Sequence, residues 1–313
     1  MATTSDDLVV LLYRQMLLVR LVDERLAALH REGRIPPHVG ARGEEAAILG
    51  AAAALRSQDW IFPSSHEIGA ALWRGISLQS YAHKVLGNAL DPGKGRELSE
   101  RLGARKAKIA SPSGVAGAHI AHAVGFAWGA KSRREDVVAL AYFDRAATSG
   151  ADFHNALNFA GVFKPPVVLF CRTSEASRAS RETASTSVAA KAIAYGIAGA
   201  SVDGGDLLAV LTTVREAVAT AASGGGPTLV EAMTPRAGTA DDPIARLRGA
   251  LETRSLWSDA KQRELELQLD AEVILAITEA ERTIDPMVAT LFDDVYAELP
   301  WHLREQRALL EKE

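Results

Sequence analysis

The sequence predicts an α/β fold with a doubly wound, mostly parallel sheet. The first observation is an apolar run at residues 137–143, followed by a loop of small and polar residues, a helix-forming segment at 152–163 and a second apolar run at 167–171. Strand, loop, helix and strand in this order are typical of two parallel strands covered by a helix. The second observation is that the alternation continues, with short strands predicted at 200–202 and 227–233 on either side of a helix. Repeated alternation of this kind favours a parallel sheet.

The N-terminal segment is predicted to be a long amphipathic helix. Ser5 or Thr4 can cap it, and the acids Asp6 and Asp7 suit the positive end of a helix dipole. Its apolar residues recur three or four positions apart, or at a multiple of that spacing: Leu8, Leu12, Met16, Val19, Leu26 and Leu29. This spacing places them on one face of the helix, which ends near Gly33.

The rest of the chain up to residue 243 is expected to alternate between helices and glycine-containing loops. Helices are predicted at 43–55, 68–73, 119–131, 187–195 and 207–222. Loops are expected at 61–67, 87–103 and 111–118. The glycines of the last loop would let a ligand or another part of the backbone come close.

We expect a single domain of 313 residues. It comprises a helical N-terminal segment at 1–35, an α/β core at 36–243 and a helical C-terminal tail at 244–313. The tail is charged and mostly helical, with breaks expected at Pro286 and Pro300.

The composition argues against several classes of protein. Hydrophobic residues make up 48% of the chain and charged residues 24%, so a sizeable core is possible. The net charge of −4 gives no reason to expect nucleic acid or an anionic membrane as a partner, and no apolar stretch approaches the roughly 20 residues that span a bilayer. The single cysteine, Cys171, allows no disulfide within the chain, and the N-terminus lacks the basic start of a secretion signal. We therefore expect a cytoplasmic protein.

The candidate ligand site lies where two predicted strands end. Asp144-Arg145-Ala146 follows the first strand and Arg172-Thr173-Ser174 follows the second. In parallel sheets ligands bind beyond the carboxyl ends of the strands, so these two loops are expected to determine the function. The GxGxxG fingerprint of dinucleotide sites is absent, which argues against a nicotinamide-dependent dehydrogenase.

Motifs that follow one another along almost the whole chain match those of one known family. They include Lys94-Gly95-Arg96, Thr148-Ser149, Asp152-Phe153-His154, Ala194-Tyr195-Gly196, Gly226-Pro227-Thr228-Leu229 and Phe292-Asp293-Asp294-Val295-Tyr296. In this order they resemble the alpha subunit of the thiamine-diphosphate-dependent 2-oxo acid dehydrogenases. The similarity is closer to the branched-chain and bacterial members than to the mitochondrial pyruvate type. It implies a thiamine-diphosphate-binding fold.

The resemblance also implies an activity and partners. In the family, the alpha chain binds the diphosphate of thiamine diphosphate through a magnesium ion, and a beta subunit completes the site. Pyruvate or a branched-chain 2-oxo acid is decarboxylated oxidatively, and its acyl group passes to a lipoyl-bearing acyltransferase. The cofactor carries the difficult chemistry while the protein holds and tunes it. The expected assembly is a heterotetramer with beta chains, or a homodimer.

The magnesium ligands that the resemblance implies are altered in this sequence. Magnesium requires hard oxygen ligands in near-octahedral geometry. The family supplies an acid in a Gly-Asp-Gly or Gly-Glu-Gly turn, an asparagine, and a backbone carbonyl two residues later. These positions hold Arg145, Ser174 and Ala176 here. A guanidinium has no acceptor atom and repels a cation, so we expect no bound magnesium and no metal-binding residues.

Other positions that the resemblance assigns to the cofactor differ as well. The candidate cofactor-binding residues there are His66, Ala116, Ala146, Ala147 and Arg172. Of these, His66 stands in the place of the family's Tyr-Arg pair, and Arg172 matches an arginine that contacts the diphosphate in branched-chain members. The loop at 234–240 is shorter than in the family and lacks its active-site histidine.

Two functions remain open at this point. In the first, the chain is a degenerate paralogue without catalytic residues, acting as a structural or regulatory partner. In the second, it is an active subunit in which Arg145 and Arg172 face one crevice and hold the diphosphate without a metal. The altered positions remove most contacts to the diphosphate, each worth roughly a few kcal/mol, so we favour the first. The histidines His66, His119 and His122 could form a new metal or acid–base cluster, but we interpret them as polar residues around the pocket.

Overall fold

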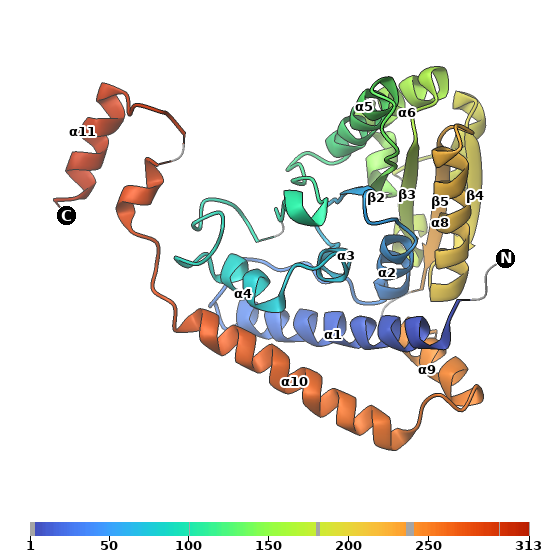
Figure 1. Cartoon of the computed structure of the whole chain (residues 1–313), viewed down its shortest axis with the longest axis horizontal. Helices are drawn as coiled ribbons and strands as arrows, with labels where there is room; N and C mark the ends of the chain where they lie inside the picture. Colours follow the sequence, from blue (N-terminus) through green and yellow to red (C-terminus); the bar gives the residue numbers. More distant parts are fainter. Residues whose placement is uncertain (1–3, 100, 180–181, 236–240, 294, 313) are drawn as a thin grey trace.

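A parallel sheet forms the centre of the protein. The computed structural model describes residues 4–99, 101–179, 182–235, 241–293 and 295–312. The strands of the sheet are β1 (Trp60–Phe62), β2 (Ala139–Asp144), β3 (Val167–Ser174), β4 (Ala198–Asp203) and β5 (Thr228–Thr234). They pair in the order β1-β2-β3-β5-β4, and each of these pairs is parallel. The α/β class predicted from the sequence is confirmed (Figure 1).

Strand β1 is an element that the sequence prediction missed. The loop expected at residues 61–67 begins inside this strand, in which Ile61 lies opposite Leu140 of β2. Three residues are too few to show an alternating pattern. Pairing with the neighbouring strand, rather than local sequence, makes this segment extended.

Helices cover both faces of the sheet. One face carries α1 (Asp6–Arg31), α2 (Glu45–Ala53), α3 (Ile68–Trp73) and α8 (Leu207–Ala222). The other carries α5 (Ala118–Ser132), α6 (Ala151–Phe163) and the 3₁₀ helix η3 (Ala189–Tyr195). Successive strand residues alternate between the two layers: Tyr142 packs with the first group, and Ala141 and Phe143 pack with the second.

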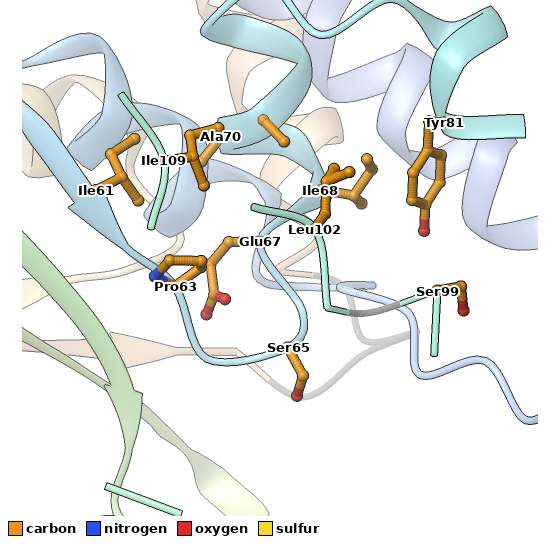
Figure 2. A pocket seen from close by; sticks show the side chains of 11 residues that line it. Ile61, Pro63, Ser65, Glu67, Ile68, Ala70, Tyr81, Ser99, Leu102 and Ile109 are labelled. Atoms are coloured by element: carbon orange, nitrogen blue, oxygen red, sulfur yellow. The ribbon is translucent and has the colours of Figure 1, made fainter. Parts of the chain in front are cut away.

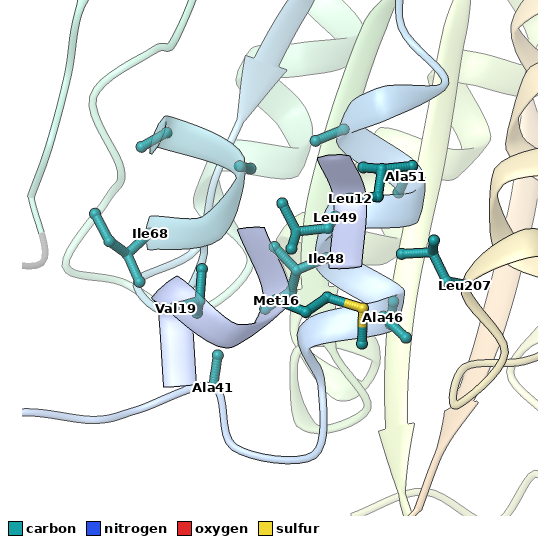
Figure 3. Close-up of a cluster of buried hydrophobic side chains, with 14 of the residues drawn as sticks. Leu12, Met16, Val19, Ala41, Ala46, Ile48, Leu49, Ala51, Ile68 and Leu207 are labelled. Atoms are coloured by element: carbon teal, nitrogen blue, oxygen red, sulfur yellow. The ribbon is translucent and has the colours of Figure 1, made fainter. Parts of the chain in front are cut away.

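The larger core is built around α1 and α2. Figure 3 shows Met16 of α1 beside Ile48 of α2, and both side chains are fully buried. The alanine-rich α2 also packs closely on α8, because a Cβ atom at Gly50 would lie only 3.0 Å from the carbonyl oxygen of Leu207. The N-terminal cap predicted for α1 is confirmed, since the Ser5 hydroxyl accepts the N–H of Leu8.

Further helices lie outside these two layers. They are α4 (Leu78–Leu86), η1 (Arg105–Ala107), η2 (Ala146–Ser149), α7 (Glu175–Ala179), α9 (Pro243–Thr253), α10 (Asp259–Glu281), η4 (Val288–Leu291) and α11 (Trp301–Leu310). Both α9 and α10 pack against α1, so the first part of the predicted C-terminal tail belongs to the body. None of the helices in the described part of the chain is sufficiently long and apolar to cross a membrane.

The last part of the chain leaves the body as an extended arm. We call residues 285–312, of which 294 is not described, the C-terminal arm. In Figure 1 it runs away from α10 and ends in α11, well separated from the sheet. It exposes large apolar side chains, including Met287 at 72% and Trp301 at 70%. Such exposure is typical of a segment that packs on another chain.

Candidate functional site

A cavity of about 200 Å³ opens at the carboxyl end of β2, where the sequence predicts a ligand site. It is lined by residues 64–66 from the loop before α3 and by residues 113–117 from the loop before α5. Phe143 and Asp144 from the end of β2 also line it, as does His119 from the first turn of α5. The cavity therefore gathers polar groups from three separate segments of the chain.

The structure brings together only some of the predicted cofactor-binding residues. Those that line this cavity are His66, Ala116 and Ala147. Those that do not are Arg145, Ala146, Arg172 and Ser174. Ala146 lies in η2 with its side chain exposed. The residue that replaces the family's metal-binding acid is thus outside the cavity, whereas the neighbouring Asp144 is inside it.

The side chain of Arg145 is buried and contacts another segment of the chain. Its side chain is only 3% exposed, and its Nη2 donates to the carbonyl oxygen of Ser185 over 2.5 Å. The nearby Ser149 hydroxyl donates to the carbonyl oxygen of Glu182. These two bonds hold residues 182–187 over the end of β2. Burial and the charge of Arg145 together lower the pKa of Lys191 in η3, so Arg145 acts on the α6 and η3 side of the sheet.

Arg172 lies on the opposite side of the sheet, and two carboxylates balance its positive charge. Its guanidinium forms ion pairs with Glu44 and with Glu67, the latter over 2.6 Å, and its Nη2 donates to the Ser64 hydroxyl over 3.1 Å. Burial acts to lower the pKa of Arg172, but the two carboxylates outweigh this and raise it. Since two carboxylates meet one guanidinium, no positive charge remains for a phosphate. The crevice that Arg145 was predicted to share with Arg172 is therefore not formed.

Ser174 serves as a helix cap. Its hydroxyl accepts the N–H of Ser177, and its carbonyl oxygen accepts the Ser177 hydroxyl over 2.9 Å. These bonds open the short helix α7, within which Ala176 lies. The position of the family's asparagine ligand is thus occupied by a side chain that stabilises a turn.

His119 lines the cavity as a neutral imidazole. Its Nε2 lies 2.6 Å from the carbonyl oxygen of Tyr142, and because a carbonyl can only accept, Nε2 carries the proton. Burial lowers the pKa of His119, which also favours the neutral form. Of the three histidines interpreted as polar residues around the pocket, His66 and His119 line this cavity and His122 does not. In the described part of the chain, no group of three or more His, Cys, Asp or Glu side chains could hold a metal ion.

A second, much smaller cavity adjoins the first. It measures about 30 Å³ and shares Ser65 with it. Figure 2 shows that the Glu67 carboxylate lies next to Pro63 and that the surrounding side chains are mostly apolar, among them Ile61 and Leu102. A space of this size holds one or two waters, so we assign it no ligand.

Three acidic residues near the site were not among the predicted cofactor-binding residues. Asp144 lies in the candidate loop, but the resemblance assigns the position of the family's acid to the next residue, Arg145. Glu44 and Glu67 were not connected with Arg172, since 128 and roughly 100 residues separate them along the chain. Only the fold brings these side chains together. The shortened loop at 234–240 was also singled out, but residues 236–240 lie outside the described part of the chain.

A parallel sheet covered by helices, with a polar cavity at the carboxyl ends of its strands, is the arrangement in which open α/β proteins bind ligands. Residues 13–239 match the family model described as "Dehydrogenase E1 component". The chain is 35% identical to the 2-oxoisovalerate dehydrogenase subunit alpha 2 of Arabidopsis thaliana, over 98% of this chain and 70% of that protein. It is 33% identical to the mouse 2-oxoisovalerate dehydrogenase subunit alpha, over 95% and 73% of the two chains. Its identity with the pyruvate dehydrogenase E1 subunit alpha of Staphylococcus epidermidis is 32%, over 96% and 86%.

The chain belongs to the dehydrogenase E1 component family, as an alpha-type subunit of the thiamine-diphosphate-dependent 2-oxo acid dehydrogenases. The described residues do not fit the family's magnesium diphosphate. Arg145 replaces the acidic ligand and binds Ser185, while the hydroxyl of Ser174 caps α7. The cavity itself contains the carboxylate of Asp144 and is lined by no lysine or arginine among the described residues.

Proposed function

We propose that this chain is a non-catalytic alpha-type subunit of a branched-chain 2-oxo acid or pyruvate dehydrogenase. In this role it lacks the magnesium-diphosphate site and acts as a structural or regulatory partner. The observation that carries the proposal is what the two arginines contact. The guanidinium of Arg145 donates to the carbonyl oxygen of Ser185, and the charge of Arg172 is offset by Glu44 and Glu67.

The same observation weighs against an active subunit with a metal-free diphosphate site. That alternative requires Arg145 and Arg172 to meet phosphate oxygens together. They lie on opposite sides of the sheet, and neither lines the cavity at the end of β2. To bind a diphosphate, Arg172 would have to leave two carboxylates, one of them on the fully buried side chain of Glu67.

We further propose that the partner is a beta chain and that the assembly is a heterotetramer, which docks a lipoyl-bearing acyltransferase. The exposed apolar side chains of the C-terminal arm support a stable partner. Large apolar residues rarely remain in water on a segment that leaves the body of a protein.

The test is to express the chain with a candidate beta subunit of this family and to assay the purified complex. We expect a complex with two chains of each kind by light scattering. We also expect no release of carbon dioxide from 2-oxoisovalerate or pyruvate that depends on added thiamine diphosphate. An alpha chain that keeps the acidic and asparagine ligands, assembled with the same beta chain, is the positive control. Cofactor-dependent turnover by the complex of this chain would overturn the proposal.

A further inference from the structure

The cavity at the end of β2 contains a carboxylate, that of Asp144. Its nearest guanidinium is that of Arg172 on β3, the residue opposite it in the sheet, which is already paired with Glu44 and Glu67. Asp144 is exposed in this cavity, and its Oδ1 accepts the N–H of Ala147 over 2.9 Å. Within the described ranges it forms no ion pair with a lysine or an arginine. The remaining acceptor positions of this carboxylate are therefore available to a ligand.

A second acceptor, the Nδ1 atom of His119, has no hydrogen-bond partner in the part of the chain that the structure describes. His119 is 3% exposed, and its Nε2 proton is used by the carbonyl of Tyr142. Its Nδ1 is therefore an unprotonated acceptor, and it has no hydrogen-bond partner among the described residues. Buried acceptors are almost always paired in native proteins, so this nitrogen points to a donor supplied by a bound molecule.

The charge of the cavity favours a cation over an anion. The N-terminus of α5 opens at Gly117 without a side-chain cap and contributes about half a positive charge. The full negative charge of Asp144 exceeds this contribution. A ligand with several phosphate charges would meet that carboxylate, and among the described residues no lysine or arginine lines the cavity to offset the repulsion.

We propose that this cavity binds a small organic cation that has N–H donors and no phosphate group. Its donors would meet Asp144 and the Nδ1 atom of His119, while Phe143 and Ala147 supply apolar contacts. The inference rests on the proposed function, in which the diphosphate site is lost, and it names the kind of ligand that the altered cavity selects. Such a ligand would make the subunit a sensor rather than a catalyst.

Thiamine and thiamine diphosphate form a matched pair of probes, because they differ only in the diphosphate. We would titrate each into the full chain by calorimetry, with EDTA and with added magnesium, both alone and in complex with the beta chain. Thiamine is expected to bind in EDTA at least ten-fold more tightly than thiamine diphosphate, and added magnesium should not change this order. Asp144→Asn keeps the acceptor for Ala147 but removes the charge, so it should weaken thiamine binding by about ten-fold to a hundred-fold.

The matched control is Asp203→Asn. Asp203 also ends a strand and accepts a backbone N–H, that of Gly205 over 2.9 Å, but it does not line the cavity. This variant should bind thiamine as the unaltered chain does. Absence of thiamine binding, or equal binding by Asp144→Asn, would overturn the inference and leave the proposed function standing. Tight, magnesium-dependent binding of thiamine diphosphate would instead overturn both.

Discussion

Among single residues near the site, Arg172 has the greatest expected effect on stability. Its guanidinium is buried and is paired with Glu44 and with the fully buried side chain of Glu67. Removing one partner of a buried pair leaves an uncompensated charge, so Arg172→Met should lower the free energy of unfolding by about 3–5 kcal/mol. Urea denaturation measures this loss, and the double variant Arg172→Met/Glu67→Gln should recover part of it.

The control for this prediction is an exposed pair at the end of another strand. Arg246 pairs with Asp203 over 2.8 Å, and the two side chains are 38% and 52% exposed. Solvent screens such a pair, so Arg246→Met should cost less than about 1 kcal/mol. Equal losses for Arg172→Met and Arg246→Met would show that burial of the Arg172 pairs does not govern their strength.

His119 is predicted to make the stability depend on pH. Burial lowers its pKa, outweighing the hydrogen bond to Tyr142 that acts to raise it. As the pH falls through the unfolded value of about 6.5, the unfolded chain binds a proton that the folded chain resists. Stability contributed by this group is therefore present above that pH and is lost below it. Between pH 7.5 and pH 5.5, the melting temperature should fall less for His119→Gln than for the unaltered chain. The control is His302→Gln, at an exposed histidine.

At the level of elements, the contact between α6 and η3 leaves no room for a side chain. A Cβ atom at Gly161 would lie 2.0 Å from the carbonyl oxygen of Tyr195. Gly161→Ala should therefore destabilise the protein by about 1–3 kcal/mol, because the two elements must move apart. Apart from its neighbours on the helix, no described residue has an atom within 4 Å of the corresponding position at Gly249 in α9. Gly249→Ala should therefore raise the free energy of unfolding by about 0.5–1 kcal/mol. A thermal or urea unfolding series of the two variants checks both the sign and the size.

Local sequence was sufficient for the elements that carry a complete pattern. The helix at 68–73 and the helix at 207–222 were predicted with the bounds that the structure has, because their apolar spacing and glycine stops are local signals. Strand β1 is too short to show a pattern and depends on its pairing with β2. Short strands of this kind are fixed by tertiary contacts, which explains why they were read as loop.

The candidate site was predictable in position but only partly in its contacts. The rule for parallel sheets located it at the end of β2, and three predicted residues line the cavity. The direction of each side chain was not predictable. Arg145 directly follows β2, whereas residues 172–174, expected as a loop, are the last part of β3. Arg172 lies opposite Asp144 in the sheet, and because successive residues alternate between the faces, Arg145 lies on the other side. The ion pairs of Arg172 depend on chain segments far apart in sequence.

At the scale of the whole molecule, we expect the C-terminal arm to contribute to assembly with a partner and not to the stability of the body. The arm carries exposed apolar residues such as Met287 and Trp301, and its helix α11 has its main contacts with η4 of the same arm. Deleting residues 285–313 should therefore change the melting temperature of the isolated chain by no more than about 2 °C, since little apolar surface of the body becomes exposed.

The same deletion should strongly weaken binding to the beta chain. Apolar and aromatic anchors in an interface are typically worth about 2 kcal/mol or more each, so loss of the arm should raise the dissociation constant at least thirty-fold. Leu267→Ser removes a side chain that is 74% exposed on α10, outside the arm, and should leave the affinity unchanged. Sedimentation of the mixed chains measures both effects. If the shortened chain still forms the complex at the original affinity, the apolar surface of the arm is not the subunit contact, and the exposed face of α10 becomes the next surface to test.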